Sequence, residues 1–282
     1  MLTQTKTVLP SAGVPRAPTD RPRPNSLTAQ QTSLSCIPYP VSVKHRDIQT
    51  EASPHESGVE CFETPAALEL NRARLAHLQS LELAVDGKRV LDVGCGVGHL
   101  AQFFLGRGCE VVCVDGREEN IAILRAHHPA LESHIADIQT DALARFGKFD
   151  VVFCYGVLYH LANPLAALHN LASVCRELLL LETLVCDHSE PILYLVDEPK
   201  TFNQALDYVA CRPSPGYVTM AVNRVGFPHV YAPEHAPEHP DFQFEWRNSL
   251  DYAREGHPIR CIFVASRQEL RNPRLRALLS RP

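Results

Sequence analysis

A glycine-rich turn directly after an apolar stretch is the feature of this sequence that most constrains its fold. Residues 89–93 read RVLDV, and residues 94–98 read GCGVG. Glycines permit a tight turn whose backbone approaches a ligand closely, and a helix that begins after such a turn directs unpaired N–H groups toward it. Open parallel sheets bind ligands at this carboxyl edge. The turn therefore predicts an α/β sheet with a ligand site at its edge.

Strand-like and helix-like segments alternate along the chain around this turn. Strands are predicted at 89–94, 110–115, 132–137, 149–156, 178–185, 228–233 and 259–266. Helices are predicted at 64–83, 99–108, 119–129, 163–177 and 216–226. Proline after a capping residue, as in Thr64-Pro65 and Ser214-Pro215, is typical of a helix start. The alternation predicts a doubly wound, mostly parallel α/β sheet of seven strands with crossover helices.

The remaining segments suggest how the domain is bounded. Residues 1–58 are rich in Pro, Ser, Thr and charge, which predicts a disordered N-terminal extension. One domain is expected over 59–270, followed by a C-terminal tail at 271–282. Within the domain, 186–213 is expected to be irregular, with a short helical piece around 201–209, and 233–258 to be a second insertion.

Composition narrows the class of protein. The formal net charge of -5 argues against a nucleic-acid partner. Ten cysteines without a C-x-x-C pair, mostly inside apolar runs, favour reduced, buried thiols over disulfides. No secretory signal is visible and no apolar run approaches the roughly 20 residues of a membrane span. We therefore expect a cytoplasmic protein without a membrane partner and leave its oligomeric state open.

Acidic residues at the ends of successive strands point to a nucleoside cofactor. A dinucleotide turn reads GxGxxG, whereas here the third glycine comes one residue early and Asp92 lies inside the strand. Asp115 ends the second strand, where a carboxylate can bind two vicinal ribose hydroxyls of NAD or of an adenosyl cofactor. Asp137 ends the third strand, where its carboxylate or the Ile138 amide can meet an adenine edge.

The motifs LDVGCGVG, VDG, AD and FDVVFCYGVLYH, in this order and spacing, resemble those of class I S-adenosylmethionine-dependent methyltransferases over roughly residues 60–266. The resemblance implies S-adenosyl-L-methionine as cofactor, a Rossmann-like sheet and an antiparallel last strand at 259–266. It also implies that the turn of Gly94, Gly96 and Gly98 holds the methionyl part, that Asp115 holds the ribose, that Asp137 and Ile138 face the adenine, and that Tyr155 and Gly156 close over the cofactor. Cys95 and Gly116, which lie within these segments, are further cofactor-binding candidates. Asp92 either stabilises the turn by bonding backbone amides or contacts the ammonium of the ligand, directly or through water.

Two segments, GVLYHLANPL and LLLLETLV, are locally similar to the tRNA wobble-uridine carboxymethyltransferases. Those enzymes follow the Tyr-His pair with basic residues, whereas residues 161–164 read LANP here. This difference and the acidic net charge favour transfer of a methyl group to an oxygen or nitrogen of a small-molecule acceptor. A tRNA-modifying (carboxy)methyltransferase and a non-catalytic S-adenosylmethionine-binding module are the alternatives.

Methyl transfer from a sulfonium is an in-line displacement, so the protein positions the acceptor, excludes water and, where needed, removes a proton. Three residues are catalytic candidates. His160 is either a general base or a packed ring bonded to a backbone carbonyl. Tyr159 either lines the acceptor pocket or is a core aromatic. Glu182, in an apolar strand, must be paired or belong to a site.

Other polar residues receive weaker assignments. Plausible acceptor-lining residues in the two insertions are Asn203, Gln204, Arg212, Trp246 and Arg247. The sequence APEHAPEHP at 232–240 contains Glu234, His235, Glu238 and His239, but its prolines forbid the regular helix that would align metal ligands. We therefore predict no metal site.

Overall fold

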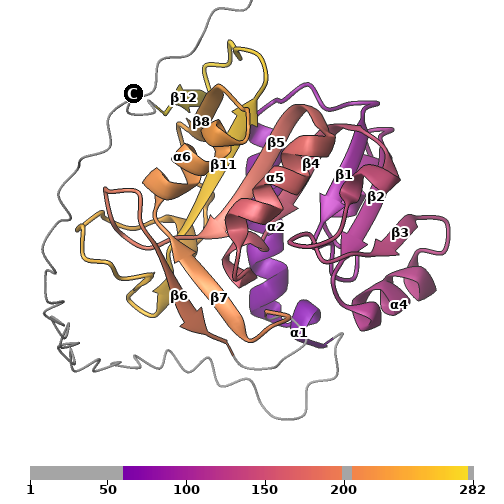
Figure 1. The fold of residues 1–282 in the computed structure, drawn as a ribbon, viewed down its shortest axis with the longest axis horizontal. Helices are drawn as coiled ribbons and strands as arrows, with labels where there is room; N and C mark the ends of the chain where they lie inside the picture. Colours follow the sequence, from indigo (N-terminus) through magenta and orange to yellow (C-terminus); the bar gives the residue numbers. More distant parts are fainter. Residues whose placement is uncertain (1–59, 199–204, 279–282) are drawn as a thin grey trace, which may run out of the picture. The chain divides into compact units, whose positions relative to one another are not determined.

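An eight-stranded sheet forms the centre of the computed structural model, which describes residues 60–198 and 205–278 (Figure 1). Its strands are β1 (Arg89–Val93), β2 (Glu110–Asp115), β3 (Glu132–Ile135), β4 (Phe149–Tyr155), β5 (Cys175–Leu184), β8 (His229–Pro233), β11 (Arg260–Ser266) and β12 (Leu275–Ala277). The spatial order is β12-β8-β11-β5-β4-β1-β2-β3. Strands β1 to β5 pair in parallel, and β11 pairs antiparallel with β5. The doubly wound fold and the antiparallel strand at 259–266 are thereby confirmed.

The number of strands differs from the expected seven. The additional strand β12 pairs antiparallel with β8, from Leu275 opposite Pro233 to Ala277 opposite Tyr231. Its three residues lie in the range that the sequence assigns to a C-terminal tail. Because so short a strand carries almost no pattern of its own, its partner in the sheet decides its conformation.

Within the described residues, six α-helices and three short 3-10 turns precede or connect these strands. They are α1 (Glu60–Glu63), α2 (Pro65–Ser80), α3 (Ala101–Leu105), α4 (Glu118–His127), α5 (Pro164–Val174), α6 (Pro215–Arg224), η1 (Leu143–Phe146), η2 (Leu158–His160) and η3 (Pro240–Phe242). The caps form as predicted: Thr64 accepts a hydrogen bond from Ala67 N at 3.2 Å, and Ser214 accepts one from Tyr217 N at 3.1 Å. Helix α3 is shorter than predicted and begins after the glycine turn.

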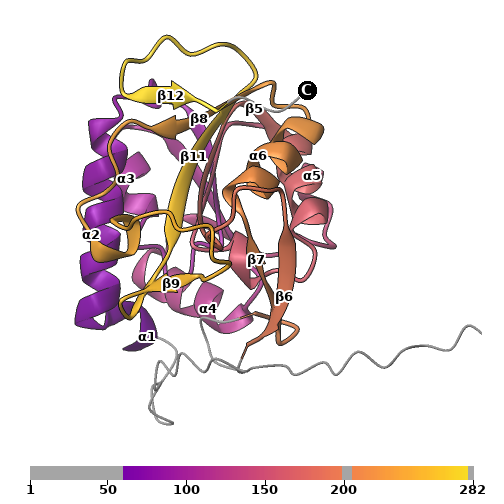
Figure 2. The same ribbon diagram turned by 90° about the vertical axis from the view of Figure 1, so that its left-hand side faces the viewer.

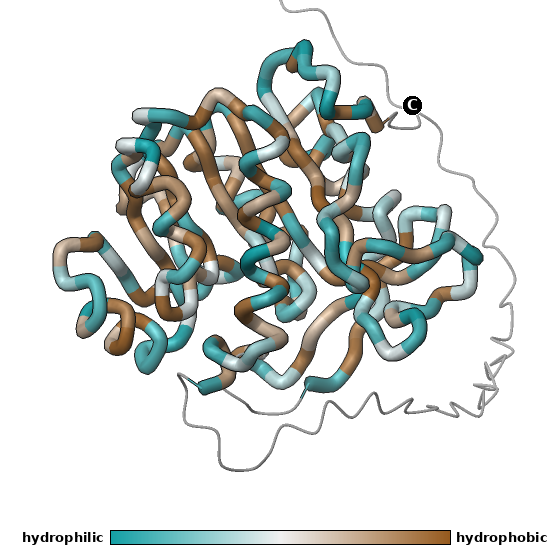
Figure 3. Tube along the Cα trace, turned by 180° about the vertical axis from the view of Figure 1, so that it is seen from behind, coloured by the Kyte–Doolittle hydropathy of each residue, from teal (hydrophilic) through white to brown (hydrophobic). Residues whose placement is uncertain are grey.

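Two apolar cores lie on opposite faces of the sheet. Helices α2 and α3 cover one face, and α5 and α6 cover the other (Figure 2). Strand β4 supplies both cores by simple alternation, with Val152 and Cys154 on one side and Val151 and Phe153 on the other. The apolar strands stand out in the hydropathy-coloured trace (Figure 3). Burial on both faces explains why these strands read as nearly continuous apolar runs.

The insertion at 186–213 contains a β-hairpin, contrary to the prediction of an irregular segment with a short helix. Strands β6 (Leu193–Asp197) and β7 (Val209–Pro213) pair antiparallel, with Leu193 opposite Pro213. Residues 205–208 form a turn leading into β7, and the rest of the predicted helical piece lies outside the described residues. A second small pair, β9 (Ala253–Arg254) and β10 (His257–Pro258), lies in the other insertion.

The structure bears on two expectations drawn from composition, one about the cysteines and one about membrane-spanning helices. All cysteines in the described ranges are free, and most of them are buried. None of the helices in 60–198 and 205–278 combines the length and the apolar character that crossing a bilayer requires. The expected disordered extension at 1–58 lies outside the described residues.

Replacing Phe104 by alanine tests the contact of α3 with the sheet. Phe104 is fully buried, and its ring meets the ring of Phe153 edge-on at a centroid distance of 5.1 Å. We expect Phe104→Ala to lower the free energy of unfolding by about 3–5 kcal/mol. The neighbouring Phe103→Ala, which removes a half-buried ring, should cost less than half as much. Urea denaturation measures both, and equal losses would contradict the assignment of Phe104 to the core.

Candidate functional site

A pocket with about 640 Å³ of empty space, part of it open to solvent, lies at the carboxyl edge of the parallel strands. It is located where the strand order reverses between β1 and β4, which is where doubly wound sheets bind ligands. The structure brings together here these residues predicted from the sequence: Gly94, Asp115, Gly116, Asp137, Ile138, Gly156 and His160. One edge thus collects residues from the ends of four neighbouring strands.

The glycine turn has a backbone that only glycine adopts easily. Gly94 has φ of 64° and Gly96 has φ of 53°, both in the left-handed region. A Cβ atom on Gly94 would also lie 2.1 Å from Cγ2 of Val157, and one on Gly96 would lie 2.9 Å from the Phe62 ring. The absence of side chains therefore lets Val157 and Phe62 pack directly on the turn.

Asp115 fastens this turn to the second strand. One of its carboxylate oxygens accepts the Gly96 N–H at 3.0 Å, and the other accepts the Arg117 N–H at 2.9 Å and the Asn120 amide at 3.1 Å. Burial raises the pKa of Asp115, although these hydrogen bonds oppose the rise. A carboxylate has about four acceptor sites, so Asp115 keeps capacity for a ligand hydroxyl in the pocket that it lines.

Asp92 is a buried carboxylate with an unused oxygen. It is only 2% exposed, and its Oδ2 has no hydrogen-bond partner among the described residues. Burial, followed by the negative charge of Asp115, raises the pKa of Asp92 to about 7. An orphaned carboxylate oxygen two residues before the glycine turn suits a cationic ligand group, whose charge would stabilise the ionised form.

The residues predicted to meet the adenine and to close the site are placed differently from one another. The Asp137 carboxylate accepts hydrogen bonds from Gln139 N and Thr140 Oγ1 in its own turn. Gly156 lines the pocket, whereas the Tyr155 ring packs on Phe153 at 4.3 Å, inside the core on the α3 side. Asp137 therefore lines the pocket with its carboxylate already bonded in its own turn, whereas Tyr155 is a core residue and not part of the pocket lining.

His160 lies in the pocket wall with an acidic partner behind it. Its Nδ1 is 2.6 Å from Oε2 of Glu198, and Oε1 of Glu198 is 3.3 Å from Nη2 of Arg212. Burial lowers the pKa of His160, although Glu198 opposes this effect. Burial alone would raise the pKa of Glu198, but the contacts with His160, Ala205 and Arg212 outweigh it and hold the pKa below its usual value. A carboxylate therefore sets the orientation of an imidazole whose protonated form is disfavoured by burial.

Glu182 is fully buried between two arginines. Its oxygens pair with Nη2 of Arg74 and with Nη1 of Arg260, the latter at 3.1 Å. Burial would raise the pKa of Glu182, but the two guanidinium groups outweigh it and lower the pKa. Tyr159 lies nearby, with the Arg260 guanidinium 5.2 Å from its ring centre. Neither Glu182 nor Tyr159 lines the pocket.

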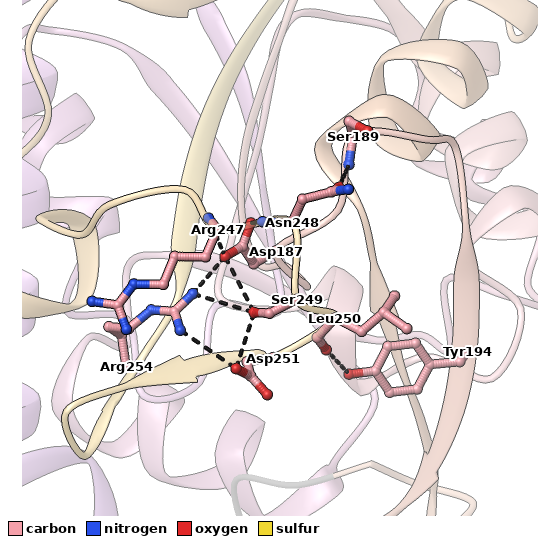
Figure 4. Close-up of polar contacts among 9 residues, drawn as sticks. All are labelled: Asp187, Ser189, Tyr194, Arg247, Asn248, Ser249, Leu250, Asp251 and Arg254. Atoms are coloured by element: carbon pink, nitrogen blue, oxygen red, sulfur yellow. Dashed lines mark hydrogen bonds and ion pairs between the residues drawn. The ribbon is translucent and has the colours of Figure 1, made fainter.

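The residues expected to line an acceptor site do not gather in this pocket. Arg212 is buried against Glu198, while Trp246 and Arg247 are exposed. Their loop is fastened by Asp187, just after β5, whose carboxylate accepts the Arg247 N–H at 2.8 Å and pairs with Arg254 (Figure 4). Asn203 and Gln204 lie outside the described residues.

The histidines of APEHAPEHP make backbone contacts. The His235 carbonyl is 2.9 Å from Nε2 of His77, and Nδ1 of His239 accepts the Asp241 N–H at 3.2 Å. In the portion of the chain with described coordinates, no group of three or more His, Cys, Asp or Glu side chains is arranged to hold a metal ion.

Several site residues escaped the sequence reasoning. Those that line the pocket are Phe62, Arg117, Asn120, Ala136, Val157, Leu161, Ala205 and Leu206. Val157 and Leu161 lie within three residues of the predicted His160 in the sequence, so this closeness could have marked them as pocket residues. Phe62, Ala205 and Glu198 come from segments far away in sequence, and no local pattern marks them.

Comparisons with known proteins agree with this geometry. A family model described as a methyltransferase domain matches residues 65–250. The ubiquinone biosynthesis O-methyltransferase of Alkalilimnicola ehrlichii is 32% identical over 112 residues, covering 38% of this chain and 45% of that protein. The tRNA U34 carboxymethyltransferase of Alteromonas mediterranea is 31% identical over 157 residues, covering 52% and 46%. The chain spans about half the length of the curated relatives it matches.

Solved structures share the fold at low sequence identity. The N-terminal domain of EvdMO1, crystallised with SAH bound, has a TM-score of 0.53 at 22% identity and covers 70% of this chain and 79% of that one. An S-adenosylmethionine dependent methyltransferase from Mesorhizobium loti has a TM-score of 0.50 at 19% identity, with coverage of 69% and 98%.

The raised pKa of Asp92 predicts a pH-dependent stability. Because the folded state holds the proton up to about pH 7 and the unfolded chain only to about 3.8, Asp92 destabilises the ligand-free protein as pH rises through this window. We expect Asp92→Asn to raise Tm at pH 8 by about 2–4 °C, equivalent to about 1 kcal/mol. The gain should shrink as pH falls toward 4. Calorimetric scans at several pH values measure it, with the exposed Asp86→Asn as control, and a pH-independent gain would contradict it.

Proposed function

This chain belongs to the methyltransferase domain family, and on that basis we propose that it transfers a methyl group from S-adenosyl-L-methionine to an oxygen or nitrogen of a small-molecule acceptor. The observation that carries the proposal is the pocket in which Gly94, Asp115 and His160 meet at one edge of the sheet. It combines a backbone surface, an acid for a sugar diol and a neutral base.

The chemistry of the pocket residues, and of the buried Asp92 just before the glycine turn, fits this cofactor. The unpaired Oδ2 of Asp92 suits the ammonium of the methionyl part, directly or through water. Asp115 retains acceptor capacity for the ribose hydroxyls, and the Ile138 backbone suits the adenine edge, because the Asp137 carboxylate is bonded within its own turn. When bound, the cofactor supplies a methyl group that its sulfonium charge already activates.

His160 is the base in the proposed reaction. Burial lowers its pKa, so the ring is neutral and able to accept a proton near pH 7. With Nδ1 directed at Glu198, Nε2 is the nitrogen that takes a proton from an acceptor hydroxyl or ammonium. Glu182 and Tyr159 contribute indirectly in this proposal, by holding neighbouring side chains in place. Glu182 pairs with Arg74 and Arg260, and the Arg260 guanidinium lies over the Tyr159 ring.

Modification of tRNA is a second candidate. The match to the tRNA U34 carboxymethyltransferase covers more of this chain than the match to the ubiquinone enzyme, 52% against 38%. The formal net charge of -5 favours a small-molecule acceptor over tRNA, because binding the phosphates of tRNA requires a basic protein surface. The small-molecule proposal also includes the cytoplasmic location that the sequence predicts.

The cofactor assignment is tested by Asp115→Ala. Calorimetric titration with S-adenosyl-L-methionine should show binding to the unaltered protein and at least about a tenfold weaker affinity for the variant, because charge-assisted hydrogen bonds to the ribose are lost. Asp150→Ala, at the opposite edge of the sheet, is the matched control and should bind normally. Equal affinity of Asp115→Ala and the unaltered protein would refute the ribose assignment.

The acceptor and the base are tested together by labelling. Cell extracts fractionated into small molecules, RNA and protein are incubated with isotopically labelled methyl donor, and mass spectrometry identifies the product. We expect label in the small-molecule fraction. Label in the RNA fraction would favour the second candidate, and the absence of any labelled product would favour a binding module.

The His160→Gln variant tests the proposed base and should lower the labelling rate at least about 100-fold. In the unaltered protein the rate should fall only at a more acidic pH than for an exposed histidine base, because burial lowers the pKa of His160 and keeps the imidazole unprotonated.

A further inference from the structure

Glu198 connects two parts of the site that are distant in sequence. It follows β6 directly and is buried. Its Oε2 lies 2.6 Å from Nδ1 of His160 and accepts the Ala205 N–H at 3.0 Å, while Oε1 pairs with Arg212. One carboxylate oxygen is therefore shared between the proposed base and a backbone amide of the pocket wall.

The pair Ala205–Leu206 lies on the side of the pocket formed by Gly116 and Arg117. Both residues line it, and the Ala205 carbonyl accepts a hydrogen bond from Nη2 of Arg117 at 3.2 Å. Leu206 packs so closely on Gly116 that a Cβ atom there would lie 2.5 Å from its Cδ1. Gly116 follows the ribose-binding candidate Asp115, so this pair lies next to the candidate ribose position. Ala205 is held through its N–H by Glu198 and through its carbonyl by Arg117.

We propose that Glu198 is a positioning residue that couples the seating of Ala205–Leu206 over the bound nucleoside to the alignment of His160. This inference rests on the proposed function, because it assumes that the nucleoside of the cofactor occupies the pocket. A ligand that holds Ala205 in place also holds Oε2 of Glu198 where it orients the imidazole. By linkage, a change at Ala205 must be felt at His160, and the reverse.

The charges around His160 determine whether its pKa should rise or fall when the coupling is broken. Glu198 faces the ring from the end of β6, Arg212 from β7 and Arg260 from β11, and the Tyr159 ring lies beside it at a centroid distance of 4.0 Å. Glu198 raises the pKa of His160, whereas burial and the two arginines lower it. Removing the charge of Glu198 must lower the pKa of His160, and freeing Oε2 from Ala205 must raise it.

The full-length protein tests this with two readouts. Affinity for S-adenosylhomocysteine is measured by calorimetry, and the pKa of His160 by NMR titration of labelled histidine. We expect Glu198→Gln to bind about tenfold more weakly and to lower the pKa of His160. Asp197→Asn, which removes the same charge from the exposed neighbouring residue, should change neither. Leu206→Ala should weaken binding several-fold and leave the His160 titration of the free protein unchanged.

Ala205→Pro is the decisive variant, because it removes the amide donor while it keeps the Glu198 carboxylate. It should weaken S-adenosylhomocysteine binding and raise the pKa of His160, since Oε2 then serves the imidazole alone. It also stands in for Glu198→Gln if that variant fails to fold. An unchanged His160 titration in Ala205→Pro, or unchanged affinity in Glu198→Gln, would overturn the coupling while leaving the proposed function intact. Failure of the unaltered protein to bind would refute the proposed function itself.

Discussion

The site depends on one buried carboxylate that joins two neighbouring strand ends. Asp115 receives N–H groups from the glycine turn after β1 and from the start of α4, so it fixes the backbone of both loops at once. Its burial would be costly without these donors. A charged group that is held by backbone amides and still has acceptor capacity is well suited to bind hydroxyls, since it needs no rearrangement when they arrive.

Buried charged side chains near the pocket pair with one another and are not left free to bind a ligand. Glu182 pairs with Arg74 and Arg260, and Arg260 also pairs with Asp241 at 2.9 Å. Two positive and two negative groups thus neutralise one another under the sheet edge. Such networks contribute little net stability, but the loss of one partner leaves an uncompensated charge. Their effect here is geometric, because Arg74 reaches the pocket-lining Gly156 and Arg260 reaches the Tyr159 ring.

The hairpin β6–β7 completes the site from outside the parallel sheet. It delivers Glu198 at the end of one strand and Arg212 from the other, and the two side chains pair next to His160. The loop fastened by Asp187 lies against the same hairpin, since the Tyr194 hydroxyl donates to the Leu250 carbonyl at 3.1 Å (Figure 4). The insertions therefore form one layer, and its contacts with η2 place the proposed base.

Local sequence patterns were enough to predict the chain order of the parallel strands and their helices, the glycine turn, and the location of Asp115, Gly156 and His160 at the sheet edge. These features follow from local rules, because periodicity, capping residues and strand ends are written in consecutive residues. The eighth strand, the hairpin, the partners of Glu182 and the role of Glu198 were decided only by tertiary structure. Glu182 meets Arg74 across 108 positions and His160 meets Glu198 across 38, and the identity of a distant partner leaves no periodic trace in either segment.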